Sequence, residues 1–191
     1  YAPRLQGDQE ILIAATRCDG AILGLLTDIS RFKTNPVFNN AIRTAIMSGE
    51  EHGSFGALQH FISPSNTGPI VLPSFQDEYQ QYCTQLHGLG IDHPDRFSRL
   101  SISEVGQLIT DRQAINDGTF RPDNRPIAVV VLPRGDHNGA FAAGNNGVAD
   151  LMRNGYRVLV FEAGNEAEVY RAVQQVGSRQ AINMLVLDAH G

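Results

Sequence analysis

The chain has 191 residues, of which 42% are hydrophobic and 18% are charged, and its formal net charge is −5. This composition indicates a globular protein and argues against a disordered one. The fifteen lysine and arginine residues form no basic patch, so nucleic acid is not an expected partner. No apolar run reaches the roughly 18 residues that a membrane span requires, so a membrane is not expected either. The two cysteines, Cys18 and Cys83, are expected to be small buried hydrophobes, since two cannot form a disulfide framework.

Residues 1–120 are predicted to form a mainly helical region. Apolar residues recur at helical spacing over residues 8–29 and again over residues 35–46. A third helix is expected over residues 74–88, and the sequence SISE at 101–104 is a capping box that opens a fourth. No motif in this region indicates a chemical activity, so its role stays open.

Residues 121–191 show a different pattern, which is typical of an α/β domain. The elements follow in the order strand 126–132, helix 148–154, strand 156–161, helix 166–176 and strand 182–187. Each strand is a continuous apolar run without alternation, which predicts parallel strands buried on both faces. Right-handed crossovers then place the loops that follow the strands along one edge of the sheet, where such folds bind their ligands. The predicted fold is therefore a parallel three-stranded βαβαβ sheet over residues ~125–191, preceded by the helical region.

The last strand leads into a histidine. Residues 182–191 read INMLVLDAHG, so that two residues separate the apolar strand from His190 and Gly191. Acyl transfer uses an imidazole of near-neutral pKa held at a rigid position, where it can exchange a proton with a nucleophile. It also uses a backbone N–H that can approach a developing oxyanion, which glycine permits. His190 and Gly191 are therefore candidate catalytic residues.

Five motifs occur in a fixed order along the α/β region: AVVVL (128–132), HNGAF (137–141), NGYRVLVF (154–161), EAEVYRAV (166–173) and LVLDAHG (185–191). With them, the stretch from Ile127 to Gly191 resembles the first half of the caspase-like (clan CD) cysteine peptidase fold. The resemblance implies hydrolysis of peptide bonds by thiolate attack, with His190 as the catalytic histidine and the Gly191 N–H in the oxyanion hole. It implies a peptide or protein substrate, no cofactor and no metal, and it admits self-association through the α/β domain.

The nucleophile of that family follows the next strand, about 50 residues beyond the histidine in caspases. Cys18 and Cys83 precede the sheet and do not match this position. The resemblance therefore implies that residues 121–191 are a truncated caspase-like domain, which we expect to be inactive without the remainder of the protein.

The pattern departs from caspases in the loop after the first strand. Where caspases carry an arginine that binds the substrate's aspartate, two residues before Gly-Ala, this sequence carries His137. A neutral imidazole cannot replace a bidentate guanidinium, so specificity for aspartate is not expected. Asp136 would favour a basic substrate side chain and Arg134 an acidic one. These three residues are the candidate substrate-binding residues. The alternative role of Asp136 and His137, together with Asn138, is a turn after the strand.

Two other interpretations stay open. The spacing Asp188-x-His190 also resembles the metal-binding motif of calcineurin-like phosphoesterases, in which such ligands help to bind a dinuclear centre. In that family the motif usually opens the domain, whereas here it follows two strand-helix units. The domain could instead be a non-catalytic caspase-like scaffold or interaction domain. A metal titration distinguishes the phosphoesterase from the peptidase. A cysteine after the next strand would support the enzyme, and its replacement by another residue would support the scaffold.

Overall fold

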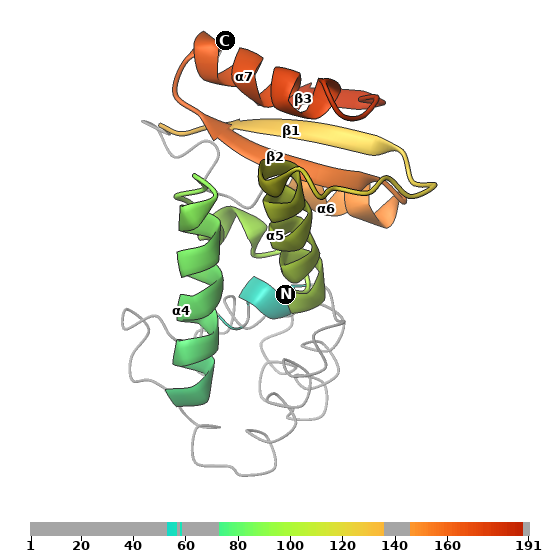
Figure 1. The fold of residues 1–191 in the computed structure, drawn as a ribbon. Helices are drawn as coiled ribbons and strands as arrows, with labels where there is room; N and C mark the ends of the chain where they lie inside the picture. Colours follow the sequence, from blue (N-terminus) through green and yellow to red (C-terminus); the bar gives the residue numbers. More distant parts are fainter. Residues whose placement is uncertain (1–52, 57, 59–72, 136–145, 189–191) are drawn as a thin grey trace, which may run out of the picture. The chain divides into compact units, whose positions relative to one another are not determined.

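The computed structural model describes residues 53–56, 58, 73–135 and 146–188 (Figure 1). The helices predicted over residues 8–29 and 35–46 lie outside this part of the chain. Contacts divide the chain into two compact units, one made of residues 1–82 with 97–105 and the other of residues 83–96 with 106–191. The predicted division at residue 120 stays a prediction.

Two long helices precede the sheet in the sequence. Helix α4 (Pro73–Gly88) matches the predicted segment 74–88, and helix α5 (Ile102–Asp117) begins at the predicted capping box. The Glu104 backbone N–H donates to Ser101 Oγ at 3.0 Å, and the Ser101 N–H donates to Glu104 Oε2 at 2.7 Å. The reciprocal bonds satisfy two N–H groups at the start of α5, and a cap of this kind stabilises a helix by about 1 kcal/mol. The capping box is thus confirmed.

The first unit has its own aromatic cluster. Phe55 is completely buried, and its ring lies 5.5 Å from that of Tyr79 and 5.9 Å from that of Tyr82, edge-on to the latter. Ser54 Oγ accepts a hydrogen bond from the Ile102 N–H at 2.9 Å. These contacts hold the short helical turn at residues 54–56 within this unit.

The second unit contains a three-stranded parallel sheet of β1 (Ile127–Pro133), β2 (Arg157–Ala163) and β3 (Met184–Leu187). The strand order is β2-β1-β3, so β1 lies in the middle although it comes first in the chain. The protein is therefore a mixed α/β protein, and the prediction of parallel strands is confirmed.

Two helices connect the strands. Helix α6 (Asn146–Arg153) joins β1 to β2, and helix α7 (Glu166–Gly177) joins β2 to β3. The chain crosses the sheet in opposite directions in these two connections, so right-handed crossovers place the helices on opposite faces. Figure 1 agrees, since the paler α6 lies behind the sheet and α7 in front of it. Gly155, with φ of 81°, ends α6 as predicted, because a left-handed residue after a helix favours glycine.

The core of the second unit lies on the face of the sheet that α7 covers. Its buried members come from alternate residues of β1 and β2, from α7, and from the end of α5 with the residues after it. They are Ile115, Phe120, Ile127, Val129, Val131, Leu159, Phe161, Ala163, Ala172 and Val176. This cluster fixes the positions of β1 and β2, and therefore of the residues at their ends.

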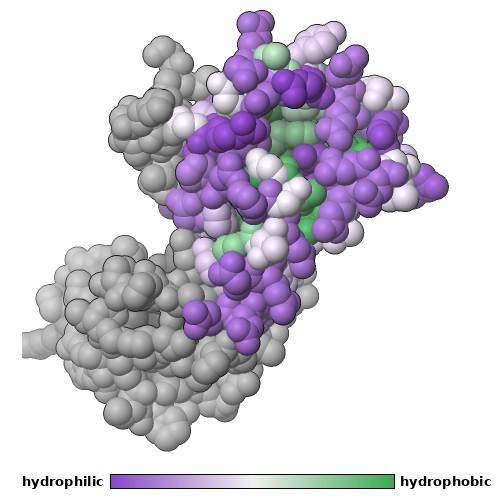
Figure 2. All heavy atoms as spheres, turned by 60° about the vertical axis from the view of Figure 1, so that its left-hand side comes forward, coloured by the Kyte–Doolittle hydropathy of each residue, from purple (hydrophilic) through white to green (hydrophobic). Residues whose placement is uncertain are grey.

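Strand β3 is less buried than predicted. Leu185 and Leu187 are 44% and 54% exposed, whereas β1 is buried from residue 127 to residue 132. The prediction of burial on both faces is wrong for β3, because among the described residues this strand pairs with β1 alone, and α7 packs on β1 and β2. Hydrophobic side chains also reach the surface in a strip that Figure 2 shows between hydrophilic residues.

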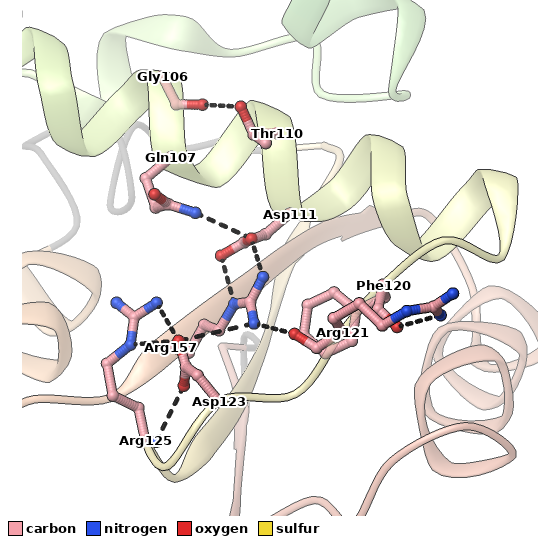
Figure 3. Close-up of polar contacts among 9 residues, drawn as sticks. All are labelled: Gly106, Gln107, Thr110, Asp111, Phe120, Arg121, Asp123, Arg125 and Arg157. Carbon is pink, nitrogen blue, oxygen red and sulfur yellow. Dashed lines mark hydrogen bonds and ion pairs between the residues drawn. The ribbon is translucent and has the colours of Figure 1, made fainter.

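A dense polar network lies at the amino end of β2 (Figure 3). Arg157 Nε donates to Asp111 Oδ2 at 2.9 Å, and Arg157 Nη2 bonds the other oxygen of the same carboxylate. Arg157 Nη1 donates to the Arg121 carbonyl at 2.5 Å and lies 3.7 Å from Asp123 Oδ2. The guanidinium also stacks 4.0 Å above the Phe120 ring. Helix α5, the 118–125 connection and β2 are thereby held together.

Candidate functional site at the carboxyl ends of the strands

The order β2-β1-β3 defines where a site is expected. The chain turns to one side of β1 to form β2 and to the other side to form β3, so a topological switch point lies between β1 and β3. Open α/β sheets bind their ligands at the carboxyl ends of the strands that flank such a point. Val131 of β1 lies opposite Leu187 of β3, so the two strands end next to each other. The segments that follow them carry all the predicted site residues.

Arg134 is the one predicted substrate-binding residue that the structure describes. Its backbone N–H donates to the Ala163 carbonyl at 2.9 Å, which extends the pairing of β1 with β2. Its guanidinium, in a side chain 44% exposed, lies 3.2 Å from Glu168 Oε2 and 4.0 Å from Asp92 Oδ2. Nη2 also donates to the Glu162 carbonyl at 3.5 Å. The positive charge of Arg134 is therefore already close to two carboxylates.

The segment 92–96, between α4 and α5, crosses the carboxyl ends of β1 and β2. The Asp92 N–H donates to Glu162 Oε2 at 2.9 Å, and His93 Nε2 lies 3.0 Å from the Arg134 carbonyl. Arg96 Nη1 donates to the Pro133 carbonyl at 2.7 Å. Two side chains thus contact the carbonyl of the last residue of β1 and that of the residue after it, which fixes the direction in which the chain leaves the strand.

Glu162 is the most unusual group at this edge. Its side chain is fully buried, with Oε1 3.6 Å from Nη1 of Arg96, whose own side chain is 2% exposed. Within the described part of the chain, this oxygen has no hydrogen-bond partner. Burial raises the pKa of the Glu162 carboxyl, although the Asp92 N–H and the charge of Arg96 act in the opposite direction. Oε1 can accept one more hydrogen bond.

Glu168 lies at the start of α7, on the same edge. It accepts a hydrogen bond from the Gly164 N–H at 2.8 Å, and this bond, with the charge of Arg134, lowers the pKa of its carboxyl. Asn165 caps the helix, its side chain accepting from the Glu168 N–H at 3.1 Å. A carboxylate at the amino end of a helix is stabilised by the helix dipole. Glu168 and Arg134 therefore join the ends of β1 and β2.

The remaining predicted residues, Asp136, His137, His190 and Gly191, lie outside the described part of the chain. Asp188 is described: it is half-buried, and its N–H donates to the Val131 carbonyl at 3.0 Å, one step beyond β3. The pairing of β3 with β1 thus continues to within two residues of His190. Among the described residues, no group of three or more His, Cys, Asp or Glu side chains could hold a metal ion.

Sequence reasoning missed five contributors to this edge: Asp92, His93, Arg96, Glu162 and Glu168. The sequence carried a signal for one of them, because Glu162 is an acid within the otherwise apolar run VLVFEA. A charged residue inside a buried strand is rare unless it is paired. No local pattern in the sequence marks the other four as parts of this edge.

The described elements define the class of the protein as α/β, with a parallel sheet and a switch point beside its central strand. No protein-family model matches the sequence, and no curated protein or solved structure shows significant similarity to it. Within the described residues, none of the helices combines the length and the apolar character needed to cross a bilayer.

Proposed function

We propose that this chain carries the histidine-bearing half of a caspase-like cysteine endopeptidase, with His190 as its catalytic histidine. The observation that carries the proposal is the order β2-β1-β3, with β1 and β3 parallel and ending side by side. His190 follows Leu187 by three residues, a chain length of at most about 11 Å. Asp136 and His137 follow Pro133 by three and four residues. A histidine and a substrate-binding loop would therefore meet at the switch point.

In this mechanism His190 accepts the proton of a cysteine thiol and later donates it to the leaving amine, and the Gly191 N–H binds the oxyanion. Asp136 and His137 would contact the substrate side chain. The contacts of Arg134 with Asp92 and Glu168 favour a role in holding the strand ends over recognition of an acidic side chain, because an incoming carboxylate would have to displace two others.

The proposal assigns the nucleophile to a cysteine that follows a further strand, as in the family. Cys83 is half-buried on α4 and precedes the sheet in the chain, so we do not propose it as the nucleophile. The test therefore uses the longest natural protein that contains this sequence.

The experiment is labelling with a peptide that carries a thiol-reactive group. We expect the protein to be labelled at a cysteine beyond residue 191, and we expect His190→Ala to abolish the labelling because the thiol is no longer deprotonated. His87→Ala is the matched control, since His87 is 79% exposed and pairs with Asp92 at 2.7 Å. Equal labelling of the wild type and of His190→Ala would contradict the proposal. Hydrolysis of a phosphate ester that requires added Mn²⁺ or Zn²⁺ would favour the phosphoesterase alternative.

A further inference from the structure

Arg112 on α5 is a buried arginine that lacks an ionic partner. The residue is 4% exposed, and its guanidinium stacks 3.7 Å above the Phe161 ring. Nη1 donates to Asn116 Oδ1 over a long 3.4 Å, and the buried Nε has no hydrogen-bond partner in the part of the chain that the structure describes. Arg112 forms no ion pair with any carboxylate of the described residues, so its charge is compensated only by an aromatic face and an amide.

The second arginine of this unit that stacks on a phenylalanine offers a direct comparison. Arg157 lies 4.0 Å above Phe120 and is bound in addition by the carboxylate of Asp111 and by that of Asp123. The two stacks are alike, but only that of Arg157 is completed by negative charge. Among the described residues, no carboxylate takes the corresponding place at Arg112.

A buried charge without a counter-charge is unfavourable, and proteins rarely keep one without a reason. Burial lowers the pKa of Arg112 to about 10, which still leaves the guanidinium charged at neutral pH. The cation–π contact with Phe161 offsets only part of this desolvation. An anion with two oxygens would supply the counter-charge, because the planar fork of a guanidinium matches carboxylate and phosphate groups.

We propose that Arg112, Asn116 and Gln175 form a binding site for a small oxyanion, either a carboxylate or a phosphate group. Gln175 Nε2 donates to Asn116 Oδ1 at 2.9 Å and joins α7 to α5 at this point. With its oxygen engaged, the Asn116 amide keeps its N–H groups as donors for the anion. Asn116 is exposed, so a ligand that reaches its amide from solvent stands next to the guanidinium. This site is independent of the proposed peptidase activity.

The test is a titration of the 191-residue chain with sodium phosphate and, separately, with sodium citrate, each at ionic strength held constant with sodium chloride. The thermal unfolding midpoint and the Nε–H resonance of Arg112 are followed. We expect both signals to change and to saturate with one of the two anions, which also identifies whether phosphate or carboxylate is preferred. Chloride alone should produce neither change.

Two variants locate the site. Arg112→Gln should weaken binding at least tenfold, whereas Arg171→Gln, which removes the same charge from an exposed position on α7, should leave it unchanged. If Arg112→Gln does not fold, Arg112→Lys keeps the charge but loses the bidentate fork, and we expect it to weaken binding severalfold. Absence of saturable binding in the wild type, or equal binding by the Arg112 and Arg171 variants, would overturn the proposal and leave Arg112 a structural cation–π residue.

Discussion

The two ends of the sheet carry polar networks of different completeness. At the amino end, Arg157 bonds both oxygens of Asp111 and the Arg121 carbonyl, and it stacks on a phenylalanine (Figure 3). At the carboxyl end, the ion pairs of Arg134 and Arg96 span 3.2 to 4.0 Å, and Glu162 keeps an oxygen without a donor.

Open α/β sheets in general bind ligands at the carboxyl ends of their strands and not at the amino ends, and the difference between the two networks agrees with this. Nearly all buried polar groups in folded proteins are hydrogen-bonded, and an exception calls for a specific reason. The exception at Glu162 falls at the carboxyl ends of the strands, where open α/β sheets in general bind their ligands, and the saturated network falls at the other end. The amino end therefore serves stability, whereas the carboxyl end keeps hydrogen-bonding capacity in reserve.

The largest effect is expected at the amino end, from Asp111→Ala. This change leaves the nearly buried Arg157 without its main partner, and removing one member of a buried ion pair destabilises a protein by about 3–5 kcal/mol. Urea unfolding at pH 7 measures the loss. Asp123→Ala is the control, since Asp123 is 42% exposed and its loss should lower the free energy of unfolding by less than about 1 kcal/mol. Equal losses in the two variants would contradict the assignment of Asp111 as the main partner.

A smaller effect is expected from Glu162→Gln, about 1–3 kcal/mol, because Arg96 keeps its bond to the Pro133 carbonyl. The variant should also change the pH dependence of stability. Burial raises the folded-state pKa of Glu162 above the ordinary 4.5, so the folded protein binds the proton more tightly than the unfolded chain. The wild type therefore loses stability as the pH rises from 4.5 through the raised pKa.

A glutamine side chain does not titrate, so the stability of the Glu162→Gln variant lacks this pH dependence. The difference in unfolding free energy between the wild type and the variant should therefore narrow as the pH rises from 4.5 through the raised pKa of Glu162. Urea unfolding at a series of pH values between 4 and 8 measures it, with Glu166→Gln, an exposed residue of α7, as the control. A gap that widens with pH would show that the charged form of Glu162 is favoured in the folded state.

The smallest effect is expected from Arg134→Gln, because the ion pairs of Arg134 are exposed and such pairs contribute little to stability. The urea midpoint should hardly move. The sensitive measurement is an NMR titration of Glu168, whose lowered pKa should rise towards 4.5 once the charge of Arg134 is gone. The Gly164 hydrogen bond should keep part of the shift. A Glu168 pKa unchanged by the substitution would mean that the hydrogen bond accounts for all of it.

Much of the described fold was predictable because its elements have strong local signals. The continuous apolar runs that became β1 and β2 indicated parallel strands, Gly155 marked the end of α6, and Ser101 with Glu104 marked the start of α5. The burial of β3 was predicted wrongly, since burial depends on what packs against a strand, and four apolar residues in a row do not specify that.

The candidate site was predictable only in its location. No local pattern indicated the strand order. The rule that the loops after parallel strands share one edge was nevertheless enough to place Arg134, which follows β1, at the edge where a site is expected. The partners of Arg134 could not be found in the same way. Asp92 and His93 come from a connection that precedes the sheet by some thirty residues, and only tertiary packing brings them to Arg134.

The central position of β1 has a consequence for the order of assembly. Its partners lie 30 and 56 residues downstream, so the pairing with β2 closes the shorter loop and is expected to form first. Every member of the Arg157 cluster is present in the chain before β3. During synthesis or refolding, the Arg157 cluster can thus form before β3 pairs with β1, and the edge of the sheet between the carboxyl ends of β1 and β3 is completed last.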